Sequence, residues 1–109
     1  MIYEVEVSEQ ADRDFREIFE YIAFELQSPE NAIGQLDRLE EQILSLDAMP
    51  KRYRKYEKEP WKSRELHILP VDNYVILYIP NSDKKVVTIL RVMYAGRDID
   101  NQLNFYTNQ

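Results

Sequence analysis

Apolar residues recur at steps of three and four through the first half of the chain, which predicts two amphipathic helices. The first stripe follows Ser8, a residue suited to cap a helix, and consists of Ala11, Phe15, Ile18, Ile22 and Leu26. The second follows Ser28-Pro29 and consists of Ala32, Leu36, Leu39, Ile43 and Leu46. Proline is accepted at the first position of a helix, and Ser28 can cap it. Because only a few residues separate the stripes, we expect an antiparallel helical hairpin over residues 9–48.

The pattern changes to alternating or continuous apolar positions at four places, which predicts four strands. These segments span residues 2–7, 66–71, 74–79 and 85–94. Asp72-Asn73 and residues 80–83 are turn signals, so the last three strands should form a meander that the first strand joins. The expected fold is a single α+β domain over residues 1–109, ordered β-α-α-β-β-β. The hairpin would pack on one face of a small, mostly antiparallel sheet, with the polar residues 98–109 at the periphery.

The composition excludes several kinds of site. The 109 residues contain no cysteine and one histidine, which argues against disulfides, a thiolate metal site or a histidine-based metal centre. We therefore expect no metal and no cofactor. Residues 1–20 lack the features of a signal peptide, and the longest apolar run, residues 74–79, is too short to cross a membrane. The sequence thus predicts a soluble cytoplasmic protein without a membrane partner.

The net charge of −6 hides an asymmetry between the two halves of the chain. Residues 1–50 carry 13 acidic and three basic side chains, a balance of −10, whereas residues 51–109 have a balance of +4. Such asymmetry indicates a partner that meets one face only. The alternative is that the acidic helices are simply solvated.

Residues 51–64 hold half of the lysines and arginines of the chain, interleaved with aromatic residues. Cations that meet phosphates and rings that stack on bases are typical of a nucleic-acid surface. The RNA-binding candidates are Lys51, Arg52, Arg54, Lys55, Lys58, Trp61 and Lys62. The alternative is a solvated connector that packs Trp61 on the core.

The last predicted strand contains an arginine, Arg91, among apolar residues, and Tyr94 and Arg97 follow it. An arginine inside an apolar strand is costly unless it meets a partner or a ligand. Arg64, Arg91 and Arg97 would converge near one end of the sheet, which makes them candidates for a functional cluster. Alternatively, Arg91 pairs with an acidic residue of the first helix, Asp14 or Glu17, and is purely structural.

The order of these elements and five short motifs resembles the RelE/ParE superfamily, the toxins of bacterial type II toxin–antitoxin systems. The resemblance covers residues 3–98. The motifs are the Ser8, Ala11, Asp14 opening of the first helix, Ser28–Ala32, Met49-Pro50, Asn73–Tyr78 and Ile89–Asp98.

The resemblance implies one of two activities. RelE-type toxins enter the ribosomal A site and cleave mRNA, whereas ParE-type toxins bind DNA gyrase and block it without being nucleases. Both are neutralised by an antitoxin that wraps the helical hairpin and a sheet edge. The expected partners are therefore a cognate antitoxin and either the ribosome with its mRNA or DNA gyrase. Because the helices are acidic, basic antitoxin side chains should contribute to the contact.

Metal-free RNA cleavage requires an activated 2′-hydroxyl, a stabilised phosphate and a protonated leaving group. By position, the resemblance implies Arg64, His67, Arg91, Tyr94 and Arg97 as catalytic candidates. The leading hypothesis is a toxin that cleaves mRNA on the ribosome. One departure favours the gyrase alternative, because Val75 stands where some RelE-type nucleases carry an arginine. A third possibility is an inactive relative that acts only as a co-repressor with its antitoxin.

Overall fold

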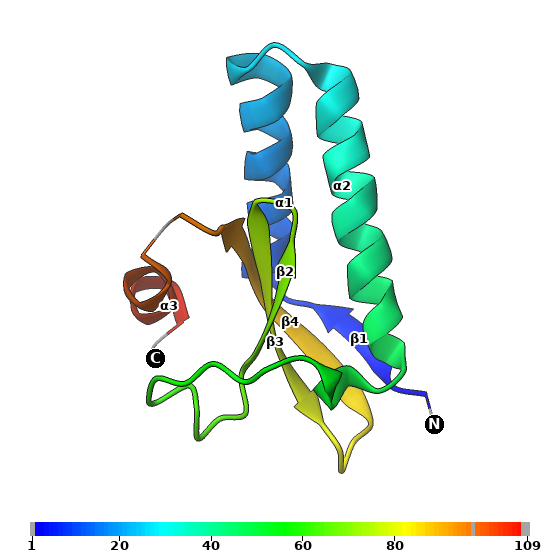
Figure 1. Cartoon of the computed structure of the whole chain (residues 1–109), viewed down its shortest axis with the longest axis vertical. Helices are drawn as coiled ribbons and strands as arrows, with labels where there is room; N and C mark the ends of the chain where they lie inside the picture. Colours follow the sequence, from blue (N-terminus) through cyan, green and yellow to red (C-terminus); the bar gives the residue numbers. More distant parts are fainter. Residues whose placement is uncertain (1, 97, 108–109) are drawn as a thin grey trace.

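The computed structural model describes residues 2–96 and 98–107 and contains one four-stranded sheet with three α-helices (Figure 1). The strands are β1 (Glu4–Val7), β2 (His67–Val71), β3 (Tyr74–Asn81) and β4 (Val86–Tyr94), and the helices are α1 (Glu9–Glu20), α2 (Pro29–Leu44) and α3 (Ile99–Thr107). The sheet order is β1-β4-β3-β2, with β1 parallel to β4 and the other pairs antiparallel. This confirms the predicted α+β fold. None of the helices in the described ranges is long and apolar enough to cross a membrane.

The helical hairpin forms where the apolar stripes predict it. Ser8 caps α1, since its Oγ accepts a hydrogen bond from the backbone N–H of Ala11 at 3.0 Å. The helix continues as a π-helical turn over Tyr21–Glu25, and α2 starts at Pro29 after a short connection. The predicted cap by Ser28 is wrong, because its hydroxyl makes no capping bond. The fixed φ of Pro29 suits the helix start without it.

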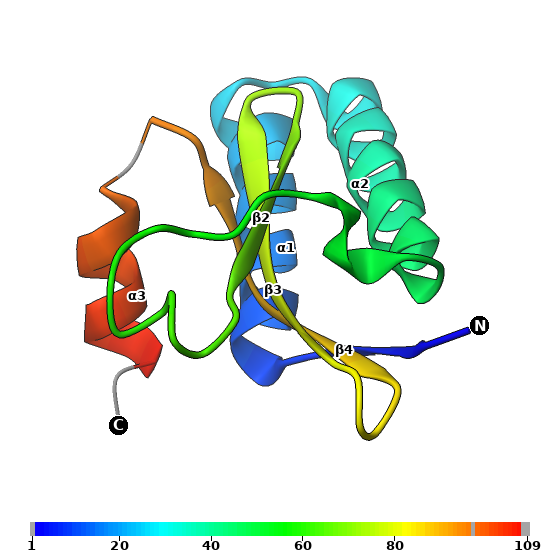
Figure 2. The same ribbon diagram turned by 60° about the horizontal axis from the view of Figure 1, so that its bottom comes forward.

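The main core lies between the hairpin and one face of the sheet (Figures 1 and 2). It is built from the predicted apolar faces of both helices and from alternate strand positions. Its most buried members include Ala11, Ala32, Leu39, Leu46, Ile76, Tyr78, Val87 and Ile89.

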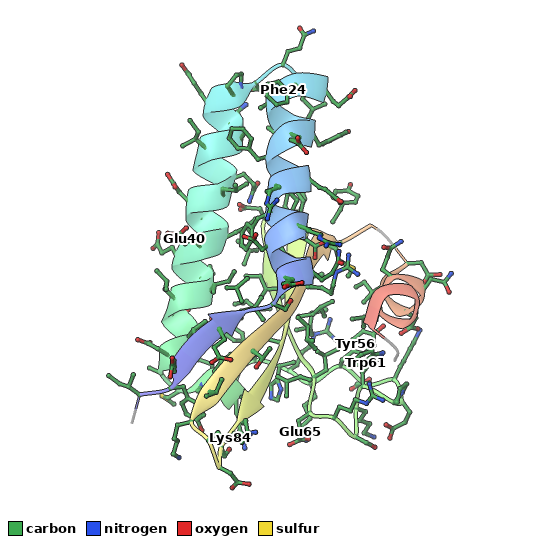
Figure 3. All side chains as sticks on the ribbon, turned by 180° about the vertical axis from the view of Figure 1, so that it is seen from behind. Phe24, Glu40, Tyr56, Trp61, Glu65 and Lys84 are labelled. Carbon is green, nitrogen blue, oxygen red and sulfur yellow. The ribbon has the colours of Figure 1, made fainter. Side chains whose placement is uncertain are left out.

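A second apolar cluster occupies the opposite face of the sheet, because its β3 members Val75 and Leu77 alternate with Ile76 and Tyr78 of the main core. This cluster is closed by α3 and by residues 51–66 between α2 and β2, which we call the connector. Its residues are Trp61, Leu66, Ile68, Val75, Leu77, Met93 and Leu103. Figure 3 shows Tyr56 and Trp61 of the connector beside α3. The expectation that residues 98–109 are merely peripheral is therefore wrong for α3, whose Leu103 is fully buried.

The connector holds α3 through a polar contact at Asp100. The Tyr56 hydroxyl donates to one oxygen of the Asp100 carboxylate, and the Lys58 ammonium lies 2.7 Å from the other. These bonds, that of Lys58 first, lower the pKa of Asp100 below its usual value. A carboxylate with a lowered folded-state pKa stabilises the fold above its unfolded pKa, and this contribution disappears as the pH falls through the folded pKa.

We expect Asp100→Asn to reduce the loss of stability that the protein shows on acidification below about pH 4. Urea unfolding midpoints across the acid range for parent and variant would measure this, with Asp83→Asn in the exposed β3–β4 turn as the matched control. Parallel pH profiles for all three proteins would contradict the expectation.

One irregularity in β4 changes which side chains face each core. Leu77 of β3 pairs with Arg91, but the next residue, Tyr78, pairs with Ile89, so Leu90 is an extra residue in β4. Such a β-bulge reverses the alternation beyond it and bends the strand. Val92 consequently joins Ile89 in the main core.

Candidate functional site

Arg91 and Asp14 form a buried ion pair where β1 ends and β4 continues with β3 as its one neighbouring strand. The pairing of β1 with β4 stops at Val7, and the chain turns into α1. The Asp14 Oδ2 then accepts a hydrogen bond at 3.0 Å from the backbone N–H of Val92, a group that has no neighbouring strand on that side. The same carboxylate accepts bonds from Arg91 Nε at 2.8 Å and Nη2 at 3.0 Å. Asp14 therefore supplies the acceptor that a neighbouring strand would otherwise provide to Val92, and it neutralises Arg91.

The Arg91 guanidinium also joins α1 to α3. Its Nη1 donates to the backbone oxygen of Gln102 at 3.2 Å, and the side chain is 3% exposed. Removal of either member of this buried pair would leave an uncompensated charge. Arg91 and Asp14 therefore depend on each other to keep α1, β4 and α3 joined. The structural alternative for Arg91, a partner in the first helix, is what the geometry shows.

Above this ion pair lies an open cleft of about 580 Å³ between α1, its π-helical turn and the ends of β3 and β4. We call it the tyrosine cleft. It is lined by Asp14, Glu17, Ile18, Tyr21, Leu26, Asn73, Tyr74, Arg91, Val92, Met93 and Tyr94. The Tyr74 and Tyr94 rings meet edge to face, with centroids 6.1 Å apart. Burial, followed by the neighbouring Tyr21 and Tyr94, raises the pKa of Tyr74. Sequence analysis selected Arg91 and Tyr94 but missed Tyr21 and Glu17 as members of one site.

His67 is buried rather than directed to solvent. It is 2% exposed, its Nδ1 lies 2.8 Å from the backbone oxygen of Glu65, and its ring packs on Tyr78 at a centroid distance of 5.4 Å. The Tyr78 hydroxyl in turn donates to the backbone oxygen of Pro50 at 2.6 Å. These contacts anchor the connector to the sheet. Within residues 2–96 and 98–107, no group of three or more histidine, cysteine, aspartate or glutamate residues is placed to hold a metal ion.

The predicted catalytic candidates therefore occupy different settings. Arg91 and Tyr94 line the same cleft, whereas the Arg64 guanidinium lies over the Trp61 ring, 4.9 Å from its centroid. Arg97 lies outside the described residues. The catalytic roles of these residues and of His67 stay predictions.

The basic connector is partly committed to internal contacts. Lys55 pairs with Glu65 and Lys58 with Asp100, while Arg52 donates to the backbone oxygens of Ala48 and Met49 at the end of the hairpin. Trp61 is 3% exposed, so its ring packs in the second cluster rather than on the surface. The remaining RNA-binding candidates, Lys51, Arg54 and Lys62, are exposed cations. RNA binding by this connector stays a prediction.

The tip of the hairpin exposes large apolar side chains. Phe24, which Figure 3 labels at the tip, is 68% exposed, and Tyr21, Leu26 and Ile33 are each more than half exposed. A shallow groove beside Phe24 is lined by Phe15, Arg16, Phe19, Glu20 and Leu36. Exposed apolar surface of this kind is typical of a protein–protein contact.

Comparison with known proteins places the chain in a family. A family model described as the ParE toxin of the type II toxin–antitoxin system parDE matches residues 5–99. A search of curated proteins finds no match. The fold resembles a chain of the chromosomal ParDE system of P. aeruginosa, with a TM-score of 0.69 and 18% identity over 85% of this chain and 96% of that one. It also resembles a mutant of the E. coli toxin RelE in the free state, with a TM-score of 0.66 and 15% identity over 94% of this chain and 93% of that one. Since the family model spans nearly the whole chain, the protein belongs to the ParE toxin family of type II toxin–antitoxin systems.

Proposed function

We propose that this toxin arrests growth by binding DNA gyrase, as ParE-type toxins do, and does not cut RNA. The observation that carries the proposal is the burial of Arg91 and His67, two of the residues that RNA cleavage would use. A buried guanidinium already paired with Asp14 is a poor partner for a phosphate, because the phosphate would have to displace a buried carboxylate. The match to the ParE family model supports the same mechanism.

The same proposal includes an antitoxin as the partner that neutralises the toxin in the cytoplasm. The solved complexes that resemble this fold include RelBE2 from Mycobacterium tuberculosis, with a TM-score of 0.64 and 21% identity over 86% of this chain and 92% of that one. The exposed apolar tip and groove of the hairpin are a suitable surface for a protein partner.

The second candidate function is mRNA cleavage on the ribosome. Its support is the set of exposed cations Lys51, Arg54 and Lys62 on the connector, which suits contact with ribosomal or messenger RNA. Of the two predicted catalytic residues that line the tyrosine cleft, Tyr94 is 51% exposed and would be the one that an RNA substrate could reach.

Two assays with the same purified toxin separate these functions. The first measures gyrase supercoiling at increasing toxin concentration, and the second measures cleavage of mRNA on programmed ribosomes with naked mRNA in parallel. We expect loss of supercoiling and intact mRNA. Undisturbed supercoiling together with ribosome-dependent cleavage would overturn the proposal. Failure of both assays, with harmless expression in the absence of antitoxin, would favour an inactive co-repressor.

We expect Phe24→Ala to weaken gyrase inhibition by about tenfold, because a large exposed aromatic side chain at a protein contact commonly dominates its affinity. Leu44→Ala is the control, since Leu44 is 58% exposed on α2 but lies at the other end of the hairpin. Inhibition curves for the two variants and the parent provide the measurement. Equal inhibition by all three would show that the tip does not contact gyrase.

A further inference from the structure

We propose that the tyrosine cleft binds an arginine or lysine side chain from a segment of the antitoxin. This inference rests on the antitoxin partnership proposed above and is independent of the gyrase mechanism. It assigns to the cleft a ligand class that the predicted roles of Arg91 and Tyr94 do not include.

The charge of the cleft selects a cation. At its floor, Asp14 and Arg91 neutralise each other, and the Asp14 carboxylate also accepts the Val92 N–H. Glu17 is an exposed carboxylate of the lining and forms no ion pair among the described residues. The described lining therefore carries one uncompensated negative charge, which disfavours a phosphate and favours an ammonium or guanidinium group.

The walls of the cleft suit the same ligand. Tyr21 is 54% exposed and Tyr94 is 51% exposed, and both line the cleft. The face of an aromatic ring attracts a cation within about 6 Å of its centroid. The apolar stem of an arginine or lysine can meanwhile pack on Leu26, as such stems commonly do on apolar surface.

The size and surroundings of the cleft indicate a protein segment as the source of the cation. A volume of about 580 Å³ exceeds that of one side chain, so the cleft can hold neighbouring residues as well. Residues 1–50, which include the α1 wall of the cleft, carry a charge balance of −10 and therefore attract a basic segment. A basic stretch of the antitoxin, already held on the adjacent hairpin, can reach the cleft without a second binding event.

Gly96 provides a structural variant that alters the cleft without changing its charge. A Cβ atom added at Gly96 would lie 2.5 Å from a carbon of the Tyr94 ring, closer than real contacts allow. Gly96→Ala must therefore displace this ring. If the ring helps to hold the cation, the substitution should weaken binding as Tyr94→Ala does, although Tyr94 itself remains.

The test measures affinity between the toxin and the antitoxin encoded in the adjacent reading frame. We expect Glu17→Gln to weaken binding about fivefold and Tyr94→Ala about tenfold, with Tyr94→Phe close to the parent because the ring is retained. Asp83→Asn, which removes one charge in the turn at the opposite end of β4, should bind like the parent. Unchanged affinity for both Glu17→Gln and Tyr94→Ala would overturn the inference. Variants that keep antitoxin affinity but lose gyrase inhibition would assign the cleft to the toxin's target instead and would also overturn it.

A peptide experiment separates failure of this inference from failure of the proposed partnership. The probe is acetyl-Leu-Arg-Leu-amide, with citrulline in place of arginine as the neutral control, and NMR resonances of the tyrosine rings report binding. We expect saturable shifts of the Tyr21 and Tyr94 resonances with the arginine peptide and much weaker ones with citrulline. Equal responses, or none, would overturn the cation site. If the adjacent protein fails to bind even the parent toxin while the arginine peptide binds, the partnership is wrong and the cation site stands.

Discussion

Asp14→Ala should destabilise the protein by about 3–5 kcal/mol, the cost expected when one member of a buried ion pair is removed. The variant leaves the 3%-exposed Arg91 without its carboxylate and the Val92 N–H without its acceptor. A domain of this size has a total stability of roughly 5–15 kcal/mol, so a large share would be lost. Urea unfolding followed by circular dichroism measures the change. The matched control is Asp12→Ala on the same helix, whose exposed pair with Arg16 should contribute less than about 1 kcal/mol.

A double variant distinguishes an uncompensated charge from a simple loss of packing. Asp14→Leu combined with Arg91→Met removes both charges and keeps apolar volume, so it should be more stable than Asp14→Ala. It should still be less stable than the parent, because the Val92 N–H remains without a partner. If the double variant is as unstable as Asp14→Ala, loss of the Val92 acceptor, rather than the isolated charge, dominates.

The hairpin and the pairing of Arg91 could be predicted from the sequence because each follows from a local pattern. Apolar positions at helical spacing define the buried faces of α1 and α2, and Pro29 marks the start of the second helix. An arginine among β-branched residues requires a partner, and the first helix offers two carboxylates, of which Asp14 is the one that Arg91 contacts. The hairpin prediction depends only on residues close in sequence. The prediction for Arg91 depends on the free-energy cost of burying an unpaired charge.

The cleft and α3 could not be predicted because they depend on tertiary packing. The bulge at Leu90 reverses the alternation of β4, so counting in steps of two assigns the residues beyond it to the wrong faces. The signal for α3 is weak, since Ile99 and Leu103 make a single helical step of four residues within a short segment that also holds Asp98, Asp100, Asn101 and Gln102. Asp98, which accepts a hydrogen bond from the Asn101 N–H at 3.2 Å, was the available cue for a helix start. Tyr21 lines the same cleft as Tyr74 and Tyr94 only because the hairpin packs on the sheet, so no local sequence pattern predicts this grouping.

Leu103→Ala should destabilise the protein by about 2–5 kcal/mol, because Leu103 is fully buried in the cluster that α3 closes. Leu44→Ala is the same chemical change at a 58%-exposed position and should cost less than about 0.5 kcal/mol. Trp61, the only tryptophan of the chain, belongs to this cluster, so its fluorescence reports on the packing of α3 directly. If α3 is part of the folded core, Leu103→Ala should shift Trp61 emission to the red and lower the unfolding midpoint. A midpoint and emission spectrum identical to those of Leu44→Ala would mean that α3 contributes no stability. In that case the junction at Arg91 would rest on Asp14 alone.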